Sequence, residues 1–129
     1  MARWLFKQEP SCYSYADLER DGQTTWDGVS NALALIHLRK VRRGDRILLY
    51  HSGKEKAVVG EMKAIAAKDG MIEVAPVRRL ERPVTLAELK SRRELANWEL
   101  IRISRLSVMP VSDEQWRLIE SLSESDTTE

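Results

Sequence analysis

Residues 57–80 read AVVGEMKAIAAKDGMIEVAPVRRL and set the architecture of this 129-residue chain. Two runs rich in apolar and β-branched residues, 57–67 and 71–80, flank the pair Asp69-Gly70. An Asp-Gly pair between two such runs is the strongest short-range signal for a β-hairpin. We therefore predict two long antiparallel strands joined by a tight turn.

Further elements are expected on both sides of this hairpin. Apolar runs predict strands at 4–6, 46–50 and 100–104, whereas capping residues and helical spacing predict helices at 15–20, 31–40 and 85–90 and after Ser112. The helix at 31–40 is apolar around most of its circumference, which favours a buried helix. Because the strands and helices do not alternate regularly, the pattern indicates an α+β domain around a curled sheet.

The length suits a single domain, which we assign to residues 1–122. Residues 123–129 lack apolar anchors and are expected to form a flexible acidic tail. The chain has no apolar run long enough for a membrane span and no signal peptide, so a cytoplasmic location is expected, or a nuclear one in a eukaryote. Cys12 is the single cysteine, which excludes an internal disulfide and a thiolate zinc cluster.

Positive charge is concentrated in one part of the sequence. Between Arg39 and Arg105 there are 17 Lys or Arg against 9 Asp or Glu, although the net charge of the chain is only +1. Clustered basic charge is typical of proteins that contact the phosphates of nucleic acids. A solvated surface with alternating charges would give a similar count, because acids interrupt the run.

Three segments carry more polar chemistry than their positions require. In Lys7-Gln8-Glu9 the alternation of a strand places Lys7 and Glu9 on one face, where they could pair beside a ligand or form an ordinary surface ion pair.

The motifs of phosphate-binding glycine loops, nucleophile elbows and His-Glu-x-x-His zinc sites do not occur, so we expect no cofactor and no metal.

The second segment, Trp26-Asp27-Gly28, places a large ring just before a turn. Trp26 could be a platform on which a base stacks. Asn31 follows, and it either contacts a ligand or simply caps the next helix. In the third segment, an apolar strand ends in Tyr50, His51 and Ser52, either as part of a ligand site or as an ordinary passage into a turn.

The order of these motifs resembles that of the EVE domain, a member of the PUA-like superfamily. The motifs that carry the resemblance are WLFKQEP at 4–10, WDGV at 26–29 with Asn31, YHS at 50–52, Val59-Gly60, and SRLSVMPV at 104–111. The resemblance implies a PUA-like mixed β pseudo-barrel surrounded by short helices. It also implies a reader that binds a modified base, with 5-substituted cytosine in DNA or RNA as the expected partner.

The resemblance assigns a role to each candidate residue. Trp26 and Asp27 would flank the base, while Tyr50, His51 and Ser52 would line its pocket. The segment Lys7-Gln8-Glu9 would contact the polar edge of the base. The rim would be formed by Asn31, Arg105, Leu106 and Ser107. The sequence departs from the family pattern at Gln8, Ser30, Ala32 and Leu33. Ser30 stands where the family commonly has an Arg that could contact a phosphate, and Ala32 with Leu33 makes the helical wall smaller and more apolar.

Three functions remain open at this point. The first is a non-catalytic reader of a modified base, whose basic residues between Arg39 and Arg105 contact phosphates. The second is an amidohydrolase acting on a modified nucleoside, with Lys7 and Glu9 as its catalytic pair, as in a neighbouring PUA-like family. The third is an interaction module that has lost ligand binding, which the departures at Ser30, Ala32 and Leu33 would allow.

Overall fold

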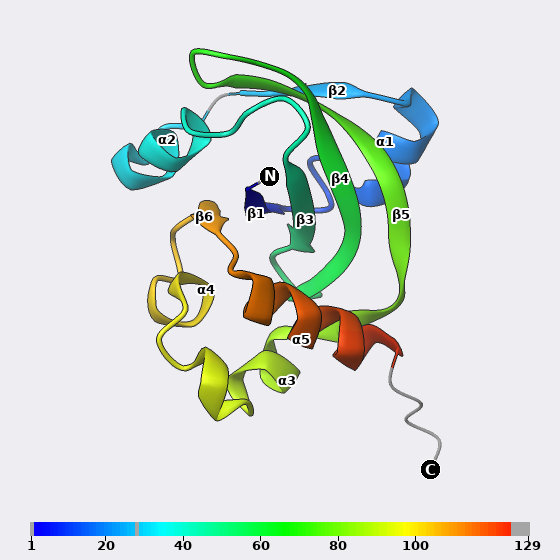
Figure 1. Ribbon diagram of the computed structural model, residues 1–129. Helices are drawn as coiled ribbons and strands as arrows, with labels where there is room; N and C mark the ends of the chain where they lie inside the picture. Colours follow the sequence, from blue (N-terminus) through cyan, green and yellow to red (C-terminus); the bar gives the residue numbers. More distant parts are fainter. Residues whose placement is uncertain (1, 28, 125–129) are drawn as a thin grey trace.

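The computed structural model describes residues 2–27 and 29–124 and contains one curled sheet covered by short helices (Figure 1). The sheet has the strand order β2-β5-β4-β3-β1-β6. Its strands are β1 (Arg3–Gln8), β2 (Thr24–Trp26), β3 (Arg46–His51), β4 (Ala57–Lys68), β5 (Met71–Thr85) and β6 (Val108–Pro110). The helices are α1 (Tyr15–Asp21), α2 (Ala32–Leu38), α3 (Leu86–Lys90), the 3-10 turn η1 (Arg93–Leu95), α4 (Glu99–Arg102) and α5 (Asp113–Glu124).

The β4–β5 hairpin forms as its sequence predicts. Lys68 pairs with Met71 across a two-residue turn, and both Asp69 and Gly70 have positive φ angles, of 52° and 82°. This is the backbone geometry of a type I′ turn, which Asp-Gly adopts readily. The pairing of the two strands shifts register at three places, and such bulges increase the bend and twist of a strand pair. The hairpin therefore arches over the molecule (Figure 1).

The arch brings the far end of the sheet back toward its middle. β1 lies between β3, to which it is parallel, and β6, to which it is antiparallel. β2 pairs only with β5 at the other side of the sheet, yet the rings of Phe6 on β1 and Trp26 on β2 are 5.4 Å apart. Side chains thus close the gap between β1 and β2, which gives the mixed pseudo-barrel expected from the sequence.

Several expectations about single elements were wrong. Residues 99–102 form helix α4 instead of a strand, and the edge of β1 is paired with β6. Helix α2 is not buried all round, since Leu33 and Ile36 are 40% and 49% exposed. The short strands β2 and β6 were not anticipated.

Helix α5 continues to Glu124, and Ser123 is buried, so the expected flexible tail does not begin at residue 123. The remainder of that tail, 125–129, lies outside the described residues.

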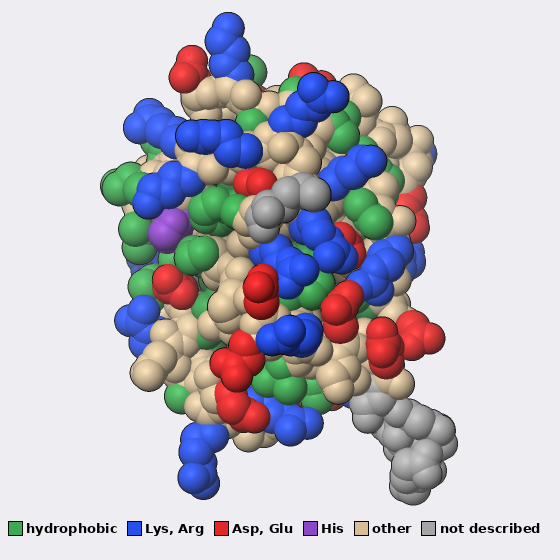
Figure 2. All heavy atoms as spheres, viewed as in Figure 1, with side chains coloured by type: hydrophobic (Ala, Val, Ile, Leu, Met, Phe, Trp, Pro, Cys, Tyr) green, Lys and Arg blue, Asp and Glu red, His purple; other side chains and the backbone are tan. Residues whose placement is uncertain are grey.

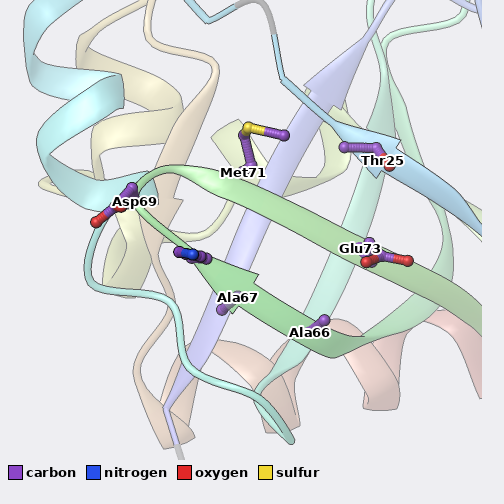
Figure 3. Close-up of a pocket in the computed structure, with 7 residues that line it drawn as sticks. Thr25, Ala66, Ala67, Asp69, Met71 and Glu73 are labelled. Atoms are coloured by element: carbon purple, nitrogen blue, oxygen red, sulfur yellow. The ribbon is translucent and has the colours of Figure 1, made fainter.

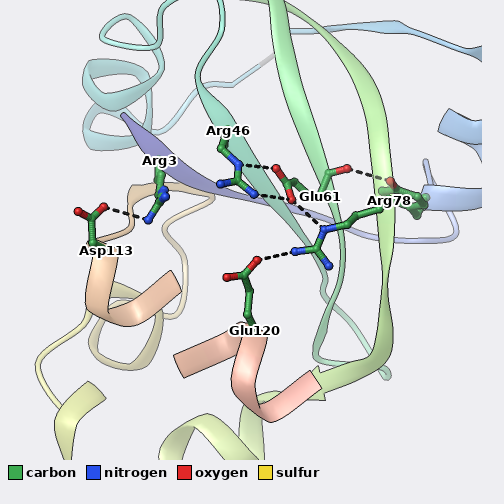
Figure 4. Close-up of polar contacts among 7 residues, drawn as sticks. Arg3, Arg46, Glu61, Arg78, Asp113 and Glu120 are labelled. Carbon is green, nitrogen blue, oxygen red and sulfur yellow. Dashed lines mark hydrogen bonds and ion pairs between the residues drawn. The ribbon is translucent and has the colours of Figure 1, made fainter. Parts of the chain in front are cut away.

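An ion-pair network fastens α5 to the sheet (Figure 4). Glu61 on β4 is buried and accepts hydrogen bonds from Arg46 at 2.6 and 3.0 Å and from Arg78 at 3.2 Å. Arg78 also pairs with Glu120 of α5 at 2.6 Å. The guanidinium carbon of Arg46 lies 4.7 Å from the ring centre of Trp116 on the same helix. A buried carboxylate is tolerated here because two guanidinium groups satisfy it.

Within the described residues, no helix has the length and apolar character needed to cross a membrane.

Candidate functional site

Two of the three polar segments meet at the carboxyl ends of β1 and β3. The strands are parallel, and their register places Lys7 opposite Tyr50 and Gln8 opposite His51. Beyond the strand ends the Glu9 carboxylate packs against Gly53, where a Cβ atom would collide with it. The sequence therefore placed the first and third segments correctly at one edge of the sheet.

β1 separates its polar residues between two sides, because successive side chains of a strand point in opposite directions. Phe6 and Gln8 point toward β2, where Phe6 contacts Trp26. Arg3 and Lys7 point toward the helices, where Arg3 pairs with Asp113 and Lys7 lies beside Leu100 and Ile101. As a result, Lys7 and Gln8 line different hollows.

We call the first of these the Trp26 hollow. It has a volume of about 190 Å³ and is lined by Gln8, Tyr13, Thr24, Thr25, Trp26 and Asp27. Trp26 is only 6% exposed and belongs to the core, so most of its ring packs against other core residues and is not open to a stacked base. Its remaining free edge forms part of the wall of the hollow.

The Trp26 hollow offers both donors and acceptors. Gln8 accepts a hydrogen bond from the Glu9 backbone N–H at 3.0 Å, which orients its amide so that the NH₂ group remains free to donate. The exposed Asp27 carboxylate supplies acceptors. The Tyr13 hydroxyl donates to Asp21 at 2.8 Å, and burial together with this bond raises the pKa of Tyr13. Such a set can recognise a small planar ligand with donors and acceptors on one edge.

The second hollow, which we call the Lys7 cavity, lies on the other side of β1. Its volume is about 320 Å³. It is lined by Lys7, Tyr50, Ser52, Gly53, Lys56, Leu86, Lys90, Leu100, Ile101 and Ser104. Lys7 Nζ donates to the Ser104 carbonyl at 3.0 Å and lies 5.6 Å from the ring centre of Tyr50. Burial lowers the pKa of Lys7 and raises that of Tyr50.

His51 and Asn31 are occupied by the fold itself. His51 Nε2 accepts a hydrogen bond from the Tyr15 backbone N–H at 3.0 Å, so the ring proton resides on Nδ1, which lies 2.7 Å from Glu55. Asn31 accepts from the Ala34 N–H at 2.9 Å and caps α2. Of the two interpretations left open for these residues, the structure supports the structural one.

The remaining candidates are divided between other places. Glu9 lines a shallow hollow with Lys54 and Glu55. Among the described residues, Glu9 forms no ion pair with Lys7, whose ammonium group donates to the Ser104 carbonyl. The segment 104–107 runs beside β1 on the side of the Lys7 cavity, where the Ser107 carbonyl accepts from the Lys7 N–H at 2.9 Å. Leu106 is buried and Arg105 is exposed, so neither lines the Trp26 hollow.

A wider hollow of about 550 Å³ lies at the tip of the β4–β5 hairpin, beside Thr25, Met71 and Glu73 (Figure 3). Carboxylates of Asp69 and Glu73 line this hollow, and they repel a polyanion. Sequence reasoning selected none of its residues.

Sequence reasoning also missed several residues of the two main hollows. These are Tyr13, Thr24 and Thr25 in the Trp26 hollow, and Leu86, Leu100, Ile101 and Ser104 in the Lys7 cavity. Lys56 and Lys90 belong to the basic stretch from Arg39 to Arg105, which was expected to contact phosphates. The others reach the hollows through tertiary packing that no local pattern records.

The arrangement of a curled six-stranded mixed sheet, short covering helices and hollows at the ends of its parallel strands defines a PUA-like pseudo-barrel. A likeness to the ASCH protein of Zymomonas mobilis, with a TM-score of 0.60 at 14% identity, supports this fold class. The sequence model of the EVE domain family matches residues 2–122, and the chain belongs to this family.

Several relatives match this chain over nearly its whole length, in sequence and in structure. Thymocyte nuclear protein 1 from Homo sapiens is 30% identical over an alignment covering 97% of this chain and 75% of the relative. A Rhodopseudomonas palustris protein solved by NMR superposes with a TM-score of 0.89 at 34% identity, covering 100% and 99% of the two chains. The human THYN1 protein, solved in complex with 5-methylcytosine-containing DNA, superposes with a TM-score of 0.88 at 28% identity over 98% of this chain and 99% of that one.

Proposed function

We propose that this protein is a non-catalytic reader that binds a modified cytosine of a nucleic acid in the Trp26 hollow. The observation that carries the proposal is the placement of the Gln8 amide and the Asp27 carboxylate around one hollow beside the Trp26 edge. The DNA-bound structure of the human relative supports the choice of ligand.

The chemistry of the hollow matches the edge of cytosine. Cytosine presents an amino donor at N4, next to acceptors at N3 and O2. Carboxylates are the usual partners of the N4 amino group, and Asp27 is placed to accept from it. The free NH₂ group of Gln8 can donate to N3 or O2. The hollow has a volume of about 190 Å³, whereas pockets for larger ligands typically have about 300–1,000 Å³. Its size therefore suits a single ring.

The two alternative functions have less support. An amidohydrolase would need Lys7 and Glu9 to act on one substrate atom, yet they line different hollows. An interaction module without ligand was suggested by the departures at Ser30, Ala32 and Leu33. None of these three residues lines the Trp26 hollow, so these three departures do not change its lining, whereas the fourth departure, Gln8, supplies one of its polar groups.

The proposal extends to the organisation and location of the chain. One domain over residues 1–122 would carry the whole function, in the cytoplasm or, in a eukaryote, in the nucleus. Basic residues between Arg39 and Arg105 would contact the phosphates on either side of the base. Single-stranded DNA or RNA is the simpler target, because removing a base from a duplex costs a few kcal/mol.

The proposal is tested by binding of single-stranded oligonucleotides that differ only in carrying 5-methylcytosine or thymine at one position. Asp27→Asn should weaken binding of the 5-methylcytosine oligonucleotide by about 1–3 kcal/mol, the value of a good base contact. It should not weaken thymine binding, because thymine has the acceptor O4 in place of the N4 amino group and the amide introduced by Asp27→Asn can donate to it. Asp69→Asn, at the hairpin tip, is the matched control. Equal affinity of the wild-type protein for both oligonucleotides, or no effect of Asp27→Asn, would contradict the proposal.

A further inference from the structure

We infer that the Lys7 cavity is a second binding site, which takes a phosphate group. The site is distinct from the Trp26 hollow and lies on the opposite side of β1. The inference does not depend on which base, if any, the Trp26 hollow binds, because it concerns different residues and a different chemical group.

The first argument is the balance of charge. Lys7, Lys56 and Lys90 come from β1, the start of β4 and the end of α3, and all line one cavity. No carboxylate lines the cavity, and within the described residues none of the three ammonium groups forms an ion pair. Like charges gathered without an acid repel one another, and a bound anion would relieve that repulsion.

Two carboxylates lie near the cavity without lining it. Glu55 borders the adjoining hollow together with Lys56 and Lys90, and its Oε1 atom accepts a hydrogen bond from His51 Nδ1 at 2.7 Å. The Glu9 carboxylate packs against Gly53. These acids offset part of the positive charge, but the three ammonium groups still outnumber them and line the cavity directly.

The second argument is the position of Lys7. Its ammonium group has three N–H donors, of which one is directed to the Ser104 carbonyl. It is half-buried between the sheet and the helices, where its charged form is poorly solvated. A phosphate in the cavity would accept the remaining donors and would restore the solvation that burial has removed.

The third argument is the shape of the cavity. Lys56 adopts a positive φ of 48°, a conformation that costs a non-glycine residue free energy of order 1–3 kcal/mol. Its carbonyl accepts from the Leu86 N–H at 2.8 Å, which ties the strained turn to α3 and hence to Lys90. The Ser52 hydroxyl adds a neutral donor, while Leu86, Leu100 and Ile101 form an apolar wall. Apolar neighbours lower the local dielectric constant, which strengthens charge pairing.

Two sources could supply the phosphate: a phosphodiester within a polynucleotide, or the terminal phosphate of a mononucleotide. Both offer the same anionic oxygens to the three lysines. The experiment therefore contains one arm for the phosphate group itself and one arm that separates the two sources.

In the first arm, ¹⁵N-labelled protein is titrated with inorganic phosphate and followed by NMR. We expect saturable shifts at the backbone amides of Lys7, Ser52 and Lys90. Lys90→Gln, which changes an exposed side chain and should not disturb folding, is expected to weaken binding about tenfold, as for loss of one charged hydrogen bond. Lys7→Gln should do the same. Lys63→Gln, on an exposed part of β4 outside the cavity, is the control. Shifts spread over the whole surface, or equal effects of Lys63→Gln and Lys90→Gln, would overturn the inference.

In the second arm, wild-type and Lys90→Gln proteins are compared with cytidine 5′-monophosphate and with an oligonucleotide that has no terminal phosphate. A tenfold loss confined to the oligonucleotide identifies a phosphodiester as the ligand, and a loss confined to the mononucleotide identifies a terminal phosphate. No loss with either overturns the inference. In every case Lys90→Gln should keep the preference for 5-methylcytosine over thymine, so failure of this site is distinguishable from failure of the base site.

Discussion

Gly60 marks the closest approach between the sheet and helix α1. A Cβ atom at this position would lie 2.5 Å from the ring of Tyr15. The Tyr15 ring is fully buried, and its hydroxyl donates to the Glu61 carbonyl at 2.8 Å. Burial raises the pKa of Tyr15 to about 12, so the phenol remains protonated and keeps this bond throughout the neutral range.

Gly60→Ala should therefore reduce the free energy of unfolding by about 1–3 kcal/mol, the usual cost of overpacking a core. Chemical denaturation followed by tryptophan fluorescence would measure it. Gly60→Ala combined with Tyr15→Leu, which removes the ring, should lose less than the sum of the two single changes. If the two losses in free energy of unfolding simply add, or if Gly60→Ala is as stable as the wild-type protein, α1 moves aside without cost.

At the scale of single residues, the sequence revealed positions better than roles. It singled out Gln8, Trp26 and Asp27, which the fold brings to one hollow, and their role in binding stays a prediction. It could not show that His51 Nε2 and Asn31 Oδ1 accept hydrogen bonds from backbone N–H groups. Local spacing does not reveal the partner of a polar group when that partner, as for His51, comes from another element.

The elements of the fold owe their positions to a few polar links as well as to the apolar core. Helix α5 depends on the network in which Glu61 joins Arg46 and Arg78 (Figure 4). Breaking a buried ion pair from one side leaves an uncompensated charge, which is costly. Both arginines keep about a third of their side-chain surface in water, at 35% and 37%, so the cost should fall at the low end of the usual range.

Glu61→Gln is accordingly expected to destabilise the protein by about 3 kcal/mol. Glu19→Gln is the matched control, because its pair with Arg79 is exposed on both sides and such pairs contribute about 0–1 kcal/mol. Thermal or urea unfolding of the two variants would measure the difference. Equal stabilities would mean that the network orients α5 without stabilising it.

Sequence patterns predicted the long elements well and the short ones poorly. The hairpin and the helices with capping boxes carry local signals, such as Asp69-Gly70 and the Ser14–Asp17 pair. The short strands β2 and β6 have three residues each and exist because a neighbouring strand offers hydrogen bonds. The α4 segment was predicted as a strand but forms a short helix that buries Leu100. For both short strands the deciding partner is distant in the sequence.

Across the whole molecule, positive charge is less concentrated than the sequence suggests. Four of the arginines between Arg39 and Arg105 are already paired with acids, namely Arg46, Arg78, Arg79 and Arg82. On the face shown in Figure 2, Lys and Arg predominate near α2 and the hairpin tip, whereas positive and negative side chains alternate over α5. Only part of the basic stretch is therefore available to phosphates.

The salt dependence of binding should reflect this limited number of contacts. If the Lys7 cavity holds one phosphate of a single-stranded oligonucleotide, log affinity should fall against log salt with a slope of about −0.7, the value for one neutralised phosphate. Fluorescence anisotropy between low and high salt would measure the slope, and a free nucleoside should show almost none. A slope several times steeper would indicate that most of the basic stretch contacts the polynucleotide.

The division of β1 between two hollows limits how this protein can change over evolutionary time. Lys7 and Gln8 are adjacent, and a single backbone strand is the partition between the two hollows they serve. Inserting or deleting one residue within β1 would turn every following side chain to the opposite side. Gln8 would then face the helices and Lys7 the core beside Trp26. Descendants of this chain can therefore retune either hollow by substitution, but a change of length in β1 would damage both hollows at once.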